Sequence, residues 1–160
     1  MKRAAVLAFA LVVVAAIGLG AQGTNFSGTW ALDQAKSQMP QMGGGGGGRG
    51  PGGGGPMTIT QTAAELAIER AGMGGQTTKS VYKLDGSESV NTTGRGESKS
   101  KCKWEGAKLV IATTSVFGER TINMTAAYSL SADGKVLTVE QTRPSQDGTD
   151  VKSTMVYNKQ

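Results

Sequence analysis

Apolar and polar residues alternate with a period of two over most of the chain after Pro56. The clearest case is the segment 122–130, whose apolar positions share one side: Ile122, Met124, Ala126, Tyr128 and Leu130. Such alternation predicts a β-strand with one buried face. Shorter alternations predict further strands around 57–59, 66–68, 82–84, 98–104, 109–111, 137–139 and 151–157. With 26–33 as the first strand, the chain is expected to form about nine strands.

Turn signals separate these segments, because glycine accepts the positive φ that tight hairpins require. The segments between the turns are too short for a strand plus a crossover helix, although the longest, 87–104, has room for two strands. Closure removes the exposed edges of an antiparallel meander, so the sequence predicts an all-β fold, a single antiparallel up-and-down β-barrel of about 8–9 strands. The turn candidates are Asp85-Gly86, Glu105-Gly106, Phe117-Gly118, Asp133-Gly134 and Asp147-Gly148.

Polar residues share the inward side of several predicted strands. This lining favours a partly hydrated cavity over a dry sandwich core. A bulge that shifted the alternation by one residue would instead place these groups outside. On the segment 98–104, Lys99, Lys101 and Lys103 are predicted to face water. The inward polar residues are Ser80, Ser98, Ser100, Thr113, Gln141 and Ser153.

The first 23 residues have the features of a secretory signal peptide, with a basic start at Lys2 and Arg3 and an apolar run over 4–20. The mature domain is then expected to span 24–160, and the protein to be periplasmic or secreted. Within that domain 40–56 is rich in glycine, with eleven glycines in the thirteen positions 43–55. This composition predicts a disordered, flexible loop.

The residue inventory excludes several classes of function. Without His, the chain cannot assemble a Ser-His-Asp or Cys-His catalytic group or a His-containing zinc site. The net charge of +5 falls to +3 without Lys2 and Arg3, which is too small a surplus to indicate nucleic acid. No spacing of acidic residues indicates a paired general acid and base. We therefore predict no catalytic residues, no enzyme activity, no metal and no cofactor.

Four segments carry a resemblance to a known family. The segment 26–33 (FSGTWALD) resembles the Gly-x-Trp opening strand of the lipocalin and fatty-acid-binding-protein superfamily. The segments 103–109, 131–138 and 153–159 are similar to the last hairpins of the fatty-acid-binding proteins. The resemblance implies a lipocalin-like barrel in which Gly28 and Trp30 close one end.

The chain also departs from that family. In the fatty-acid-binding proteins an Arg-x-Tyr on the closing strand holds the ligand carboxylate. Here Met155 stands at the position of the Arg, and only Tyr157 remains. The pair of lid helices expected after the first strand is missing, and the glycine-rich tract occupies its place.

Five inward residues are candidate ligand contacts. They would supply apolar surface with a few hydroxyl groups, which is the usual composition of a small-molecule site. They are equally compatible with an ordinary hydrophobic core. The five residues are Tyr82, Met124, Tyr128, Met155 and Tyr157.

Two functional hypotheses follow. The first is an exported, monomeric, non-enzymatic barrel that binds a small apolar or amphipathic ligand in its cavity. The alternative is a filled barrel that acts as a structural or interaction module at the cell envelope. In that case Lys99, Lys101 and Lys103 would meet acidic polymers or lipid head groups.

Overall fold

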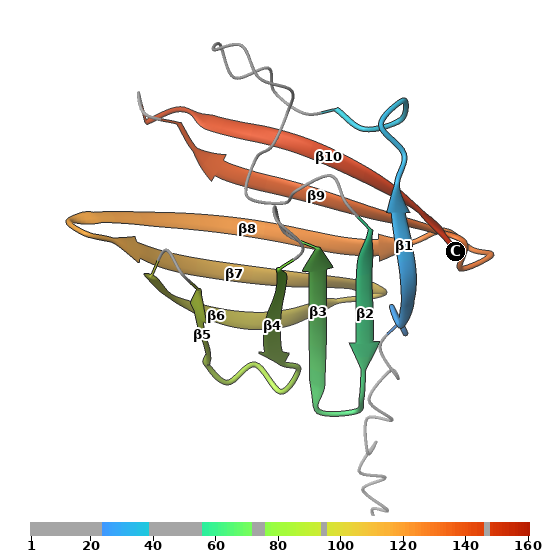
Figure 1. The fold of residues 1–160 in the computed structure, drawn as a ribbon, viewed down its shortest axis with the longest axis horizontal. Coiled ribbons are helices and arrows are strands. Elements are labelled where there is room, and N and C mark those ends of the chain that lie inside the picture. The colour runs from blue at the N-terminus through green and yellow to red at the C-terminus, as the bar shows by residue number, and fades with distance from the viewer. Residues whose placement is uncertain (1–23, 39–55, 72–75, 94–95, 146–147) are drawn as a thin grey trace, which may run out of the picture.

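The computed structural model describes residues 24–38, 56–71, 76–93, 96–145 and 148–160 (Figure 1). The predicted signal peptide at 1–23 and all but the last residue of the predicted loop at 40–56 lie outside these ranges. The described residues form ten antiparallel strands in a single sheet. The strands are β1 (Gly28–Leu32), β2 (Met57–Gln61), β3 (Glu65–Ala71), β4 (Thr77–Lys83), β5 (Ser89–Thr93), β6 (Gly96–Glu105), β7 (Lys108–Phe117), β8 (Arg120–Leu130), β9 (Val136–Pro144) and β10 (Asp150–Lys159).

The all-β antiparallel fold is confirmed, but the prediction of about 8–9 strands is wrong, because the described residues contain ten. The extra strand is β5, which shares the segment between the first two predicted turns with β6. Its one apolar residue, Val90, is 54% exposed, whereas Ser89 is buried. The usual burial pattern is therefore reversed on β5, and hydropathy alternation gives no signal for it.

Side chains close the barrel where β4 and β5, the two edge strands of the sheet, meet. The Asn91 side chain accepts a hydrogen bond from the Val81 amide at 2.8 Å and donates one to the Val81 carbonyl at 3.0 Å. The Ser89 hydroxyl accepts a hydrogen bond from the Lys83 amide at 2.7 Å. Two polar side chains thus take the place of a backbone ladder, and the barrel is nearly closed.

Four of the predicted turns connect consecutive strands as expected, and of the fifth only Gly148 is described, because Asp147 lies outside the described residues. Their glycines all take positive φ angles, between 60° and 84°. This is the left-handed region that a side chain disfavours, which explains why a glycine stands at each of these five positions. The five glycines are Gly86, Gly106, Gly118, Gly134 and Gly148.

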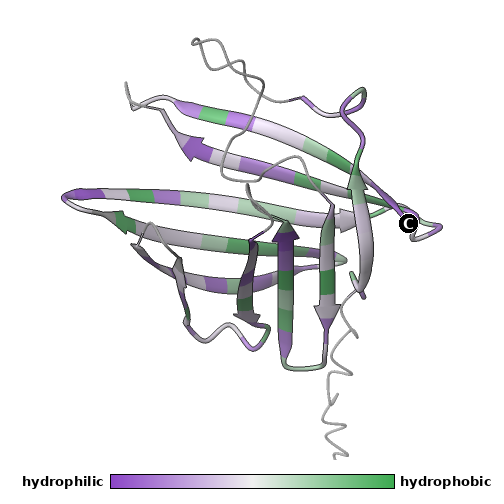
Figure 2. Ribbon diagram, in the orientation of Figure 1, coloured by the Kyte–Doolittle hydropathy of each residue, from purple (hydrophilic) through white to green (hydrophobic). Residues whose placement is uncertain are grey.

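The strand registers place the predicted polar residues inside the barrel. Ser100 lies opposite Thr113, and Gln141 lies opposite Ser153. Ser100 is 2% exposed, and its hydroxyl shares a hydrogen bond with that of Thr113 at 2.9 Å. The alternative in which a shifted alternation puts these groups outside is therefore wrong. Figure 2 shows the alternation as bands along the strands.

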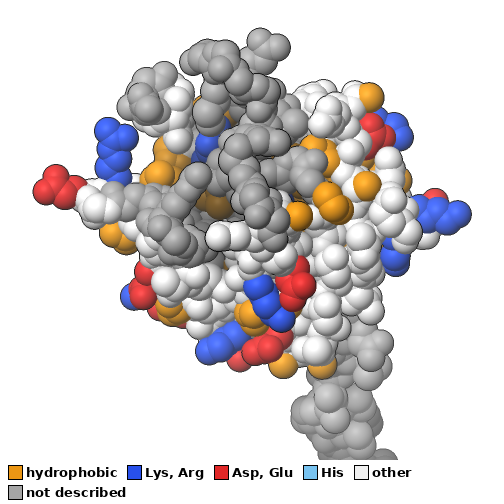
Figure 3. Space-filling model, viewed as in Figure 1, with side chains coloured by type: hydrophobic (Ala, Val, Ile, Leu, Met, Phe, Trp, Pro, Cys, Tyr) orange, Lys and Arg blue, Asp and Glu red, His pale blue; other side chains and the backbone are white. Residues whose placement is uncertain are grey.

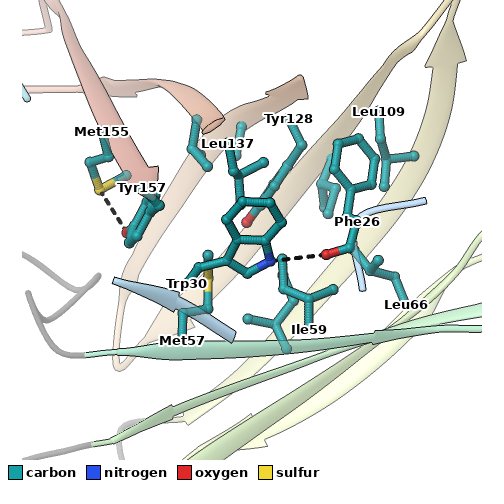
Figure 4. Packing of buried hydrophobic residues seen from close by; sticks show 14 of the residues in the cluster. Phe26, Trp30, Met57, Ile59, Leu66, Leu109, Tyr128, Leu137, Met155 and Tyr157 are labelled. Atoms are coloured by element: carbon teal, nitrogen blue, oxygen red, sulfur yellow. Dashed lines mark hydrogen bonds between the residues drawn. The ribbon is translucent and has the colours of Figure 1, made fainter. Parts of the chain in front are cut away.

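An aromatic cluster fills much of the core (Figure 4). Trp30 is fully buried beside Met57, and its indole N–H donates a hydrogen bond to the Phe26 carbonyl at 3.0 Å. The Phe26 ring stacks on Trp104 at 6.0 Å and meets Tyr128 edge-on at 6.2 Å. These contacts tie the segment before β1 to β6 and β8 across the barrel.

Gly28 begins β1 with a φ of 147°, a conformation that residues with a side chain rarely adopt. A Cβ atom at this position would lie 2.9 Å from Cε of Lys159. The Lys159 ammonium in turn lies 5.5 Å from the centroid of the Trp30 ring. The Gly-x-Trp pair therefore allows β10 to pack a cation closely over the buried indole.

Candidate functional site

Three tyrosines and one arginine meet inside the barrel. The tyrosines, the only three in the chain, come from β4 (Tyr82), β8 (Tyr128) and β10 (Tyr157). Arg70 of β3 shares their face because it pairs with the buried Met57. Its guanidinium donates to the Tyr157 hydroxyl at 3.5 Å. We call these four residues the Arg70 cluster.

Met155 completes the surroundings of Tyr157. The Tyr157 hydroxyl donates to the Met155 sulfur at 3.6 Å (Figure 4). Both residues are buried, with Tyr157 fully so. Four of the five candidate contacts predicted from the sequence thus lie on β4, β8 and β10 around Arg70.

Burial and charge set the ionisation of the Arg70 cluster. Burial raises the pKa of Tyr128 to about 12, although Arg70 opposes the shift. Burial also raises the pKa of Tyr82, against a hydrogen bond with Ser80 that lowers it. For Arg70, burial lowers the pKa, but the nearby tyrosines outweigh it and the net shift is upward. At neutral pH the guanidinium is charged, and the Tyr82 and Tyr128 phenols are neutral.

The charge of Arg70 has no acidic partner in the described ranges. Every ion pair that the structure shows there is made by a lysine. An anion beside Arg70 would find an unneutralised guanidinium together with phenol hydroxyls that can donate hydrogen bonds. The acidic residues of the strands all lie on outward positions: Glu65, Glu69, Glu97, Glu105, Glu140 and Asp150.

Arg70 corrects an expectation drawn from the resemblance. With Met155 at the position of the family's arginine, Tyr157 was expected to have no cation beside it. The structure instead brings a guanidinium from β3 to the same hydroxyl. The signal was present in the sequence, because Arg70 follows Leu66 and Ile68 on the apolar side of one alternating strand. An arginine on that side predicts a cation inside the barrel.

Met124, the fifth candidate contact, lies apart from the Arg70 cluster. It precedes Tyr128 by four residues on β8, which is about 13 Å along a strand. Its sulfur accepts a hydrogen bond from the Gln141 side-chain amide at 2.9 Å. Met124 is half-buried, so it borders the polar part of the inner face rather than the aromatic core.

Cys102 is buried on the inner face of β6, and burial raises the pKa of its thiol to about 11 from an ordinary 9.0. A rise of this size lowers the thiolate fraction at neutral pH about a hundredfold. We therefore expect dithionitrobenzoate to react with the native protein at least about a hundredfold more slowly than with the urea-unfolded chain. Equal rates in the two states would show that the thiol is accessible and ionised.

The predicted basic stripe on β6 is largely neutralised. Lys99 pairs with Glu88 at 3.9 Å, and Lys103 pairs with Glu105 at 3.1 Å. Among the described residues, only Lys101 of the three lysines has no carboxylate partner. On the face seen in Figure 3, basic and acidic side chains are interspersed. The outer face of β6 is therefore not the strong basic patch that the hypothesis of an envelope module requires.

Two further features are absent from the part of the chain that the structure describes. No three or more acidic or Cys side chains are grouped so that they could hold a metal ion. No helix there has both the length and the apolar character needed to cross a membrane.

No protein-family model and no curated protein sequence matches the chain. Solved structures do match. A secretary abundant heat soluble protein from Ramazzottius varieornatus has a TM-score of 0.59 at 16% identity, over 86% of this chain and 97% of that one. Zebrafish ileal bile-acid-binding protein complexed with cholic acid has a TM-score of 0.57 at 17% identity, over 84% and 98%. A variant of the fluorescent protein UnaG has a TM-score of 0.56 at 19% identity, over 84% and 96%.

These similarities establish the fold. They confirm that the chain has the barrel fold that the resemblance to the lipocalins and fatty-acid-binding proteins implied. With ten strands, the barrel is of the fatty-acid-binding-protein type rather than a lipocalin of eight or nine strands.

Proposed function

We propose that this protein is a non-enzymatic carrier that holds a small amphipathic molecule inside its barrel, with an anionic group of that molecule against Arg70. The observation that carries the proposal is the charged guanidinium on the inner face, which has no carboxylate partner among the described residues. Arg70 is half-buried, and partial removal of a charge from water without a counter-ion is unfavourable. A ligand anion would remove that penalty.

The surroundings of Arg70 support this choice of ligand. Tyr128 and Tyr82 keep their protons to high pH, so both can donate to an anion. Met57 and Ile68, buried nearby on β2 and β3, make the surroundings of Arg70 apolar, as an amphipathic ligand requires. One structural neighbour, the zebrafish protein, is a bile-acid-binding protein that was solved with cholic acid.

The test compares an acid with its neutral analogue. We expect Arg70→Met to weaken binding of cholic acid or a long-chain fatty acid about tenfold to a hundredfold, because a hydrogen bond to a charged group contributes about 1.5–3 kcal/mol. Binding of the alcohol of the same chain length should change little. Isothermal titration calorimetry measures both affinities.

Lys79→Met is the matched control for Arg70→Met. It removes one positive charge from the exposed outer face of the neighbouring strand, where Lys79 pairs with Glu69 at 3.1 Å. Exposed ion pairs contribute little, so the acid should bind this variant as it binds the wild type. An equal loss of acid and alcohol affinity in Arg70→Met would contradict a role of Arg70 in charge recognition.

The N-terminal sequence supports a further proposal, that the protein acts in the periplasm or outside the cell. The segment 1–23 has the pattern of a cleavable signal peptide. Purification from fractionated cells of the source organism, followed by N-terminal sequencing, tests this. A mature N-terminus near residue 24 in the exported fraction is expected, and an intact Met1 in the cytoplasm would contradict export.

A further inference from the structure

β8 and β9 separate at one end of the barrel. Their pairing runs from Leu130–Leu137 to Thr125–Thr142 and stops there. Beyond that point β8 stays with β7 as far as Arg120, and β9 stays with β10 as far as Pro144. The two strands visibly diverge in Figure 1. Pro144 has no N–H, so it cannot donate to a ladder at that end.

A groove of about 720 Å³ lies at this split. Lys101, Ala112 and Thr114 line it on the outer side of β6 and β7. Its walls at the split are 123–125 of β8 and 142–144 of β9, so it touches Met124 and Arg143 as well. Both residues belong to the inner face: Met124 lies on the same side of β8 as the buried Tyr128, and Arg143 lies on the same side of β9 as the buried Val139. The groove therefore connects the outer surface with inner-face residues.

Arg143 places a positive charge on the inner side of the split. It is half-buried, and within the described ranges it makes no ion pair. The acidic residues that line the groove are Glu88, which pairs with Lys99, and Asp150 on the outward side of β10. A cation at the mouth of a cleft raises the local concentration of anions and their rate of association.

We propose that the split between β8 and β9 is the entrance through which an anionic amphipathic ligand reaches the barrel interior, and that Arg143 attracts the anion there. The inference rests on the proposed function. On the inner side, the hydrogen bond from Gln141 to Met124 crosses between the two strands. Parting of these two side chains opens the way toward Arg70 without breaking any pair of the β8–β9 ladder.

The test closes the split covalently. In a Cys102→Ser background, Asn123→Cys and Pro144→Cys are joined by a short bis-maleimide, and stopped-flow fluorescence follows binding of anilinonaphthalene sulfonate, an anionic amphipathic dye. We expect the cross-link to slow association and dissociation by at least about tenfold each while the equilibrium affinity stays within about twofold. The same cross-link between Val81→Cys and Val90→Cys, on the outer face of the β4–β5 junction, should leave both rates unchanged.

A single substitution tests Arg143 without a cross-link. Arg143→Gln should slow association of the dye about threefold to tenfold at low salt, and the difference should shrink at high salt. Lys152→Gln, which removes an exposed charge from β10, should not slow association. Unchanged rates in both the cross-linked protein and Arg143→Gln would overturn the entrance while leaving the carrier function intact. Failure of the wild type to bind the dye would overturn the carrier function and the entrance together.

Discussion

Trp30→Ala should lower the free energy of unfolding by about 3–5 kcal/mol, the range for removing a buried aromatic side chain. Trp30 is fully buried, and its indole N–H satisfies the Phe26 carbonyl. The substitution leaves a cavity beside Met57 and removes the ring over which Lys159 lies. Domains of this size are stable by about 5–15 kcal/mol, so the variant should be close to unfolding at 37 °C. Urea denaturation followed by circular dichroism measures the loss.

Two further variants separate the contributions of Trp30. Trp30→Phe keeps most of the buried surface but leaves the Phe26 carbonyl without its donor, so it should lose about 1–3 kcal/mol. Val116→Ala truncates an apolar side chain that is 50% exposed and should change stability by less than about 0.5 kcal/mol. If Trp30→Ala were no more destabilising than Val116→Ala, Trp30 would have no role in closing the barrel.

The sequence predicts those parts of the fold that local residues determine. The turn glycines and the alternation on β8 depend on neighbouring positions, and both were predicted. β5 was missed because its inward residues Ser89 and Asn91 bond to the backbone of β4, ten or fewer positions away in sequence but across the barrel junction. An inward polar side chain fits a strand only where it has a hydrogen-bond partner. The partners of Ser89 and Asn91 are backbone groups of β4, which come within reach only when the barrel closes.

The candidate site shows the same division. Alternation alone places Tyr82, Tyr128 and Tyr157 on inward positions, but it does not show that they share one arginine. Their meeting depends on the neighbouring strands β3 and β4 facing β8 and β10 across the barrel, which the order of strands in the closed sheet determines. Met124 has the same inward signal and lies elsewhere because it stands four residues further along β8. Whether a side chain points inward follows from the alternation along its own strand. Which other side chains lie at the same height in the barrel depends on how the strands are arranged around it.

Alkaline pH should destabilise the protein through the Arg70 cluster. The pKa of Tyr128 rises from an ordinary 10.0 to about 12 in the folded state. Between these values the unfolded chain loses the phenol proton and the folded chain retains it, so unfolding becomes more favourable as pH rises. At about 1.4 kcal/mol for each pKa unit, the free energy of unfolding should fall by roughly 3 kcal/mol across this window and level off above it. Urea midpoints measured from pH 9 to pH 12 test the expectation.

Tyr128→Phe isolates this contribution from other alkaline titrations. Lysine ammonium groups also lose protons in the window, but they do so equally in the wild type and the variant. The variant should therefore show a shallower fall of stability with pH, and the difference between the two curves belongs to Tyr128. Tyrosinate absorbance supplies a direct check, since the chain has only three tyrosines and all belong to the Arg70 cluster. If Tyr128 ionised near pH 10 in the native protein, its phenol would be in contact with water. The Arg70 cluster would then be too hydrated to hold an anion by charge-assisted hydrogen bonds, because water screens such contacts.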